Sequence, residues 1–180
     1  MKKVLKILAY LCCIILGIFY VVIIYLGINA KNTTSTEYRL FFIEDKLKYY
    51  PINDALSYNL GDEIDYSNMN DTSTYLDSLR IGNRSITIEE DGALYIDGEN
   101  ARIFFKGIEK KDLTLELALG QIEDYESINV YINDNEIYKF TQEQDYALYE
   151  IKKEYIGDDG LIELKLDSTD KVKLNKIKIY

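Results

Sequence analysis

A run of 22 residues without a charged side chain, from Ile7 to Ile28, constrains this chain more than any other feature. As an α-helix the run is about 33 Å long, which is enough to cross the hydrocarbon core of a bilayer. Three lysines lie among the six residues before the run, and the nearest basic residue after it is Lys31. Because positive residues are retained on the cytoplasmic side, we expect a single-pass protein of the cell membrane with a cytoplasmic N-terminus and an extracytoplasmic C-terminal domain.

Two other interpretations of the N-terminus compete with an uncleaved anchor. A secretory signal peptide has an apolar region of about 7 to 15 residues that ends at a small-x-small cleavage site. The run here is longer, and Ala30 offers only a poor site. Lipidation at Cys12 or Cys13 would need small residues before the cysteine, where Tyr10 and Leu11 stand. We therefore favour an uncleaved anchor.

The part of the chain after residue 30 is strongly acidic and carries few kinds of reactive group. It holds 18 basic and 31 acidic residues, a net charge of −13 (18 − 31). Nucleic acid is therefore not an expected partner, since phosphate binding requires a basic surface. The chain has no histidine, and both cysteines lie in the apolar run, which removes histidine triads, cysteine nucleophiles and most zinc, copper and haem sites. We expect no catalytic residue, no cofactor and no metal.

After residue 82 the chain repeats short segments in which every second residue is apolar, the pattern of strands with one buried face. Asp91-Gly92 and Asp97-Gly98 separate such segments as tight turns. Many short strands with almost no helical period predict an all-β fold, an antiparallel β-sandwich or jelly roll, over residues 38–180. Residues 1–30 are then the basic tip and anchor, and the polar residues 31–37 a stalk. We predict strands at residues 38–43, 86–88, 94–96, 103–105, 113–119, 127–132, 136–140, 146–151, 161–166 and 171–180.

Two local features modify this pattern. In the last strand Leu174 and Ile177 lie on opposite parities, which predicts a β-bulge near Asn175. Residues 46–81 give mixed signals, but Asp71 is a candidate N-cap for one helical turn near residues 72–80.

The external part also carries a series of residues in a recognisable order: Leu60, Gly61, Ile64, Tyr75, Leu76, Gly82, Gly92, Gly98, Ala101, Asp112, Leu113 and residues 128–133. This order resembles a jelly-roll, galactose-binding-like module at the outward ends of bacterial phosphoglycerol-transferase-like and glycosyltransferase-like membrane proteins. The chain departs from that module in lacking tryptophan near Gly82 and Leu94, in having Asp134 where a glycine follows Asn133, and in having one membrane helix. The resemblance implies a sandwich that sits beside glycan-handling machinery, and it implies no activity.

Tyrosine is the abundant aromatic residue, with 17 copies and no tryptophan. Most of the tyrosines are expected to pack within strands, where this residue is favoured. A tyrosine ring can also stack on a sugar ring while nearby Asn and Asp side chains bind hydroxyl groups. On this basis the candidate ligand-binding residues are Tyr95, Asp97, Asn100, Tyr131 and Asn133.

Acidic residues permit two further hypotheses that we rank below ordinary turn chemistry. Residues 89–91 with Asp97 and Glu99 contain enough carboxyl groups for a glycosidase acid and base. The same residues, or Asp158 and Asp159, offer oxygen ligands for calcium, but no segment follows the order of a calcium-binding loop.

Two non-enzymatic functions remain. In the first, the external domain binds or positions cell-envelope carbohydrate. In the second, it is a protein-interaction subunit that docks on a polytopic envelope membrane protein, because similar modules are fused to many helices. The net charge of −13 opposes adhesion to anionic polymers, so neutral sugars are the expected glycans.

Overall fold

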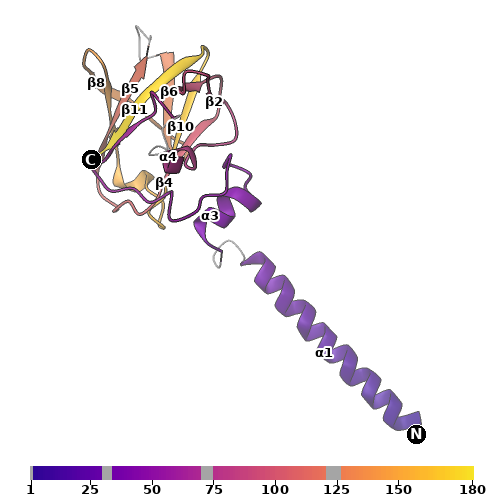
Figure 1. The fold of residues 1–180 in the computed structure, drawn as a ribbon. Coiled ribbons are helices and arrows are strands. Elements are labelled where there is room, and N and C mark those ends of the chain that lie inside the picture. Colours follow the sequence, from indigo (N-terminus) through magenta and orange to yellow (C-terminus); the bar gives the residue numbers. More distant parts are fainter. Residues whose placement is uncertain (1, 30–33, 70–74, 121–126) are drawn as a thin grey trace. The chain divides into compact units, whose positions relative to one another are not determined.

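The computed structural model describes residues 2–29, 34–69, 75–120 and 127–180. The chain divides into two compact units, residues 1–39 and residues 40–180, each of which is described by itself (Figure 1). The second unit begins two residues after the domain start expected from the sequence.

The first unit is dominated by a single long helix, α1 (Lys2–Ile28). Within it, Lys6–Ile28 is long and apolar enough to cross a membrane, a property that signal sequences share. Every residue from 6 to 28 is exposed, as a helix that meets lipid on all sides would be. The charge-free run is thus confirmed as one continuous helix that could anchor the chain.

The predicted strand at residues 38–43 is wrong. The segment is helical, and consists of the end of α3 (Thr36–Tyr38) and the π-helical turn η1 (Arg39–Ile43). Ser35 is the N-cap of α3, since its Oγ accepts a hydrogen bond from the Tyr38 N–H at 3.2 Å. A capping residue upstream has therefore outweighed the strand propensity of the aromatic residues.

The second unit contains two antiparallel sheets, and the antiparallel β-sandwich expected from the sequence is confirmed. The larger sheet has the strand order β2–β3–β11–β5–β9–β8, and β1 also pairs with β11. Its strands are β1 (Glu63–Asp65), β2 (Ile86–Ile88), β3 (Leu94–Ile96), β5 (Leu113–Gly120), β8 (Lys139–Gln142), β9 (Ala147–Ile151) and β11 (Val172–Ile179).

The smaller sheet has the strand order β4–β10–β6–β7 (Figure 1). Its strands are β4 (Ala101–Phe105), β6 (Ile128–Ile132), β7 (Asn135–Ile137) and β10 (Ile162–Ser168). Two short helices complete the described elements, α4 (Tyr75–Ser78) and the 3-10 helix η4 (Lys153–Tyr155). The expected helical turn near residues 72–80 is present as α4, whereas its expected cap, Asp71, lies outside the described residues.

The core lies between the two sheets and is built from the alternating residues of their strands. In β5 the four leucines are buried while the residues between them are only partly so. They join one cluster with side chains of the smaller sheet such as Ile103, Val130 and Leu164. Each such side chain contributes roughly 1.5–3 kcal/mol by leaving water.

The last strand has the bulge that its sequence predicts. The register between β11 and β5 shifts between Leu174 and Lys176, and the carbonyl of Asn175 accepts a hydrogen bond from the Tyr66 N–H instead. The predicted single strand at residues 136–140 is wrong, because β7 pairs with β6 in one sheet and β8 with β9 in the other. The chain changes sheets at Tyr138.

Residues 40–58, here called the cover segment, pack on part of the outer face of the smaller sheet, and Tyr58 at their end belongs to the main core. In a second apolar cluster Leu40, Leu47 and Leu56 meet Phe104 and Leu161. Main-chain hydrogen bonds fix the end of the segment, from the Tyr58 N–H to the Lys106 carbonyl and from the Lys106 N–H to the Leu56 carbonyl. The side chains of the smaller sheet that face this segment are therefore not at the surface.

Candidate functional site

Tyr95 stands on the outer face of the larger sheet. Its neighbours in β3, Leu94 and Ile96, are buried in the core, so the alternation of the strand turns Tyr95 outward. Lys173 of β11 is the residue paired with it across the sheet. The Nζ atoms of Lys171 and Lys173 lie 5.0 Å and 6.0 Å from the centre of the tyrosine ring.

An acidic turn, residues 89–91, lies beside this ring. Its main chain is closed by a hydrogen bond from the Gly92 N–H to the Glu89 carbonyl, and Gly92 has a φ of 79°, which glycine adopts without strain. Glu89 accepts a hydrogen bond from Lys171 Nζ at 2.5 Å, and an oxygen of Asp91 lies 3.5 Å from Lys173 Nζ. Lys171, which directly precedes β11, and Lys173 of β11 therefore link the turn to the larger sheet.

Between the turn and the ring is an open depression of about 520 Å³. It is lined by Glu89, Glu90, Asp91, Tyr95 and Lys171. One aromatic face, three carboxylates that accept hydrogen bonds and one ammonium that donates them are thus gathered around one hollow. This depression is the candidate functional site.

The charges around the depression stabilise each other in their ionised forms. A hydrogen bond from the Ala93 N–H, with a smaller contribution from Lys173, lowers the pKa of Asp91. A hydrogen bond to Glu89, together with the charges of Glu89 and Asp97, raises the pKa of Lys171. A general acid needs a raised pKa, whereas the pKa of Asp91 is lowered. Asp91 therefore gives the glycosidase hypothesis no support.

The five candidate residues from the sequence fall into two groups on different sheets. Tyr95 is in β3 of the larger sheet, and Asp97 follows that strand with its N–H donating to the Ser85 carbonyl. Tyr131 lies in β6 of the smaller sheet, while Asn100 directly precedes β4 and Asn133 directly follows β6. Of the five, only Tyr95 lines the depression. Asp97 influences the site indirectly, because its charge helps to raise the pKa of Lys171.

The ring of Tyr131 already has a partner on its face. The Nζ atom of Lys165 lies 3.8 Å from the ring centre, and the same ammonium is 3.3 Å from Asp167. Asp167 in turn accepts a hydrogen bond from the Asn100 N–H at 2.7 Å. A sugar could stack on that face of Tyr131 only by displacing the lysine.

The side chain of Asn133 makes hydrogen bonds to main-chain groups. Its Nδ2 donates to the carbonyls of Tyr155 and Leu161 at 2.7 Å and 2.9 Å, and its Oδ1 accepts from the Glu163 N–H at 2.9 Å. Its φ of 47° is left-handed, a conformation that asparagine tolerates better than most residues. These bonds give Asn133 a structural role at the end of β6.

The structure does not support the calcium hypothesis. In the described parts of the chain, no three acidic, histidine or cysteine side chains lie close enough together to bind a metal ion. Asp158 pairs with Lys110 at 2.6 Å, and Asp159 accepts a hydrogen bond from the Leu161 N–H at 3.3 Å. These two acids make the contacts of an ordinary surface turn.

Comparison with known proteins leaves the site to be judged on its geometry. No protein-family model matches the chain, and no curated protein is significantly similar to it. Sequence reasoning missed Lys171, which lines the depression, and Lys173, which pairs with Tyr95 across the sheet. The available signal was that they alternate with apolar residues in the last strand, but only the pairing of β11 with β3 brings them to Tyr95.

Proposed function

We propose that this protein is a membrane-anchored, non-catalytic module whose external β-sandwich binds cell-envelope carbohydrate at the Tyr95 depression. The observation that carries the proposal is the gathering of Tyr95, Lys171 and the acidic turn around one open hollow of about 520 Å³. A hollow of this size accommodates one or two sugar rings.

The recognition chemistry follows from the groups that line the hollow. A tyrosine ring offers an apolar face to the C–H face of a sugar, and ionised carboxylates accept hydrogen bonds from sugar hydroxyl groups. Each carboxylate has about four acceptor positions, so the ion pairs of Glu89 and Asp91 leave positions for hydroxyl groups. The local excess of negative charge favours a neutral glycan over an anionic one.

The placement of the module rests on α1 and on the lysines that precede it. A helix able to cross a membrane, with basic residues on its N-terminal side, supports a cytoplasmic N-terminus and an external domain. The resemblance to modules of bacterial envelope proteins supports the same location by analogy.

A second candidate function is that of an interaction subunit for a polytopic membrane protein. The observation that favours it is the edge strand β8, where Phe140 is 57 % exposed and the neighbouring Tyr138 is 73 % exposed. An edge strand can add a strand from a partner, and aromatic residues are common interface anchors.

The two candidates are separated by measuring sugar binding and partner capture on the same protein. The full chain in lipid nanodiscs is applied to an array of neutral envelope glycans, together with the variant Tyr95→Ala. Loss of the aromatic face should weaken binding roughly tenfold. The matched control is Tyr138→Ala, which removes an exposed tyrosine outside the depression. No glycan signal, together with a stoichiometric membrane partner lost in Tyr138→Ala, would favour the second function.

A further inference from the structure

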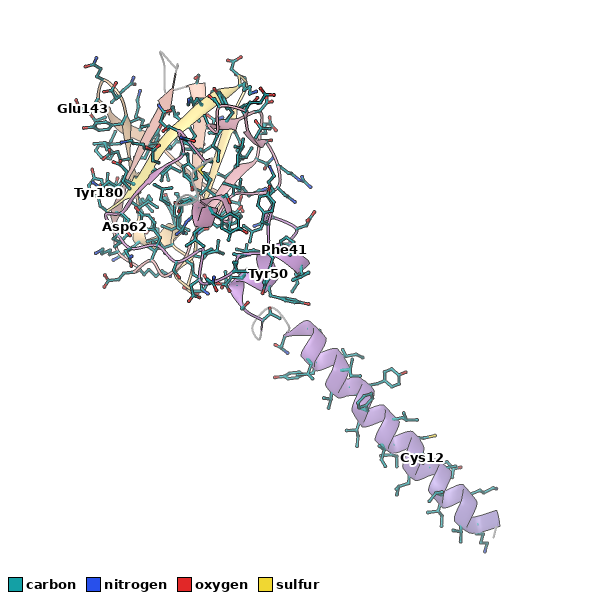
Figure 2. All side chains as sticks on the ribbon, viewed as in Figure 1. Cys12, Phe41, Tyr50, Asp62, Glu143 and Tyr180 are labelled. Carbon is teal, nitrogen blue, oxygen red and sulfur yellow. The ribbon has the colours of Figure 1, made fainter. Side chains whose placement is uncertain are left out.

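Three aromatic rings form a connected group where the chain enters the second unit. The ring of Phe41 lies 4.9 Å from that of Phe42 and 5.6 Å from that of Tyr50, and the last two are 5.5 Å apart. Figure 2 shows Phe41 and Tyr50, both in the cover segment, close to each other. Phe41 packs against the second apolar cluster, so the group is attached to a fixed part of the fold.

This group presents apolar surface to the surroundings. Phe42 is 59 % exposed and Tyr50 is 43 % exposed. Three further large apolar residues of the same segment are similarly exposed, namely Ile43, Tyr49 and Ile52. We call these five residues the aromatic patch. Soluble proteins seldom leave such a set exposed in one segment unless something covers it.

The position of the patch in the chain indicates what covers it. Leu40 is the first residue of the second unit, and the patch begins two residues later. The tether between the end of α1 and Leu40 is residues 29–39, eleven residues, which can span at most about 40 Å. The tether therefore enters the second unit directly beside Phe42 and Ile43, the first two residues of the aromatic patch.

The chemistry of the patch fits the headgroup region of a bilayer. Tyrosine is enriched there because its ring is apolar and its hydroxyl is polar, and phenylalanine and isoleucine add apolar area. Lys48 has its Nζ 5.7 Å from the centre of the Tyr49 ring, and its long stem can extend its charge toward water or phosphate. With a net charge of −13 outside the anchor, long-range electrostatics does not draw the domain to anionic lipid.

We infer that the aromatic patch docks on the headgroup region of the bilayer that holds α1, so that the β-sandwich rests on the membrane surface with its Tyr95 depression in a set orientation. The inference rests on the anchoring part of the proposed function and is independent of sugar binding. A second copy of the chain and a protein partner are the competing occupants of the patch.

The test is a spin-label measurement on the full chain in phosphatidylcholine vesicles. Cys12 and Cys13 are replaced by alanine, and one nitroxide is attached through Tyr50→Cys or, as the matched control, through Tyr138→Cys. Docking predicts that the label at position 50 collides several-fold less often with a water-soluble nickel complex than the label at position 138, and more often with oxygen. Adding Phe42→Ser should raise the collision rate of the label at position 50 with the nickel complex to that of the control. The protein should still remain in the vesicles after an alkaline wash.

Each other outcome overturns the inference in a recognisable way. A label at position 50 that is as accessible to nickel as the control shows that the patch faces water. Shielding that comes with spin–spin broadening and grows with the protein-to-lipid ratio assigns the patch to a second copy. Shielding that survives Phe42→Ser shows that the patch does not cause it. Loss of the protein in the alkaline wash contradicts both the anchor and the docking.

Discussion

The ammonium of Lys46 lies 2.6 Å from Oε2 of Glu163, and this pair joins the cover segment to the outer face of the smaller sheet. Oε1 of the same carboxylate accepts a hydrogen bond from Nε of Arg102 at 2.5 Å. Glu163 is only 5 % exposed, so its charge is compensated by two cations rather than by water.

Replacing this carboxylate should destabilise the sandwich. Glu163→Gln leaves Arg102 and Lys46 facing a neutral amide, with Glu44 as the remaining acid beside Lys46, and we expect the free energy of unfolding to fall by about 2 kcal/mol. Urea unfolding of the full chain in detergent measures the change. The control is Asp158→Asn, which breaks the ion pair with Lys110 at the surface and should leave stability unchanged. Equal effects of the two variants would contradict the role of Glu163.

The Lys46 ion pair should be lost at alkaline pH. Burial lowers the pKa of Lys46, but the hydrogen bond and charge of Glu163, with those of Glu44, outweigh it and raise the pKa above its ordinary 10.5. The stabilisation is therefore complete below pH 10.5 and disappears as the pH rises through the folded-state pKa. The difference in unfolding free energy between the native chain and Lys46→Met, followed against pH, should shrink only above pH 10.5. A decrease that begins at neutral pH would be evidence against this pair.

Arg80 should be irreplaceable by lysine. Its guanidinium donates to the carbonyls of Leu56 and Ser57 at 2.8 Å and 2.6 Å and pairs with Asp77 at 3.2 Å. Lysine keeps the charge but cannot make these bonds together, so Arg80→Lys should cost about 2 kcal/mol in thermal or urea unfolding. The same change at the exposed Arg84 should have no measurable effect.

The turn after β6 should be sensitive to substitution at its first position and tolerate substitution at its second. Asn133→Ala removes three hydrogen bonds to the main chain and should destabilise the fold by about 2 kcal/mol. Asp134 is exposed with a φ of 64°, which glycine adopts readily, so Asp134→Gly should change stability by less than about 0.5 kcal/mol. If Asn133→Ala were as mild as Asp134→Gly, the hydrogen bonds of Asn133 would not support the turn.

The regular part of the sandwich was predictable because its signal is local. Alternation alone locates β5, and a change of parity alone locates the bulge at Asn175. The helical segment at residues 36–43 was not predictable from propensity, since Phe41 and Phe42 suit a strand and the capping by Ser35 decides otherwise. The division of residues 135–142 between two sheets depends on which strands are neighbours, which no short segment encodes.

The candidate site was predictable only in part for the same reason. Tyr95 could be proposed as an outward aromatic residue and the acidic turn could be seen in the sequence, but their partners Lys171 and Lys173 are more than 70 positions away. From the sequence, Tyr131 and Asn133 looked as available for ligand binding as Tyr95. Their contacts with Lys165 and with main-chain groups appear only once β6 and β10 are paired.

The most direct measurement of the central claim is a titration of the full chain in nanodiscs with neutral oligosaccharides, followed by the NMR signals of the tyrosine rings. Binding at the depression predicts saturable shifts of the Tyr95 ring that vanish in Tyr95→Ala, while the rings of Tyr131 and Tyr138 keep their positions. Saturable shifts confined to other tyrosines, or no shift with any neutral glycan, would contradict a carbohydrate site at Tyr95.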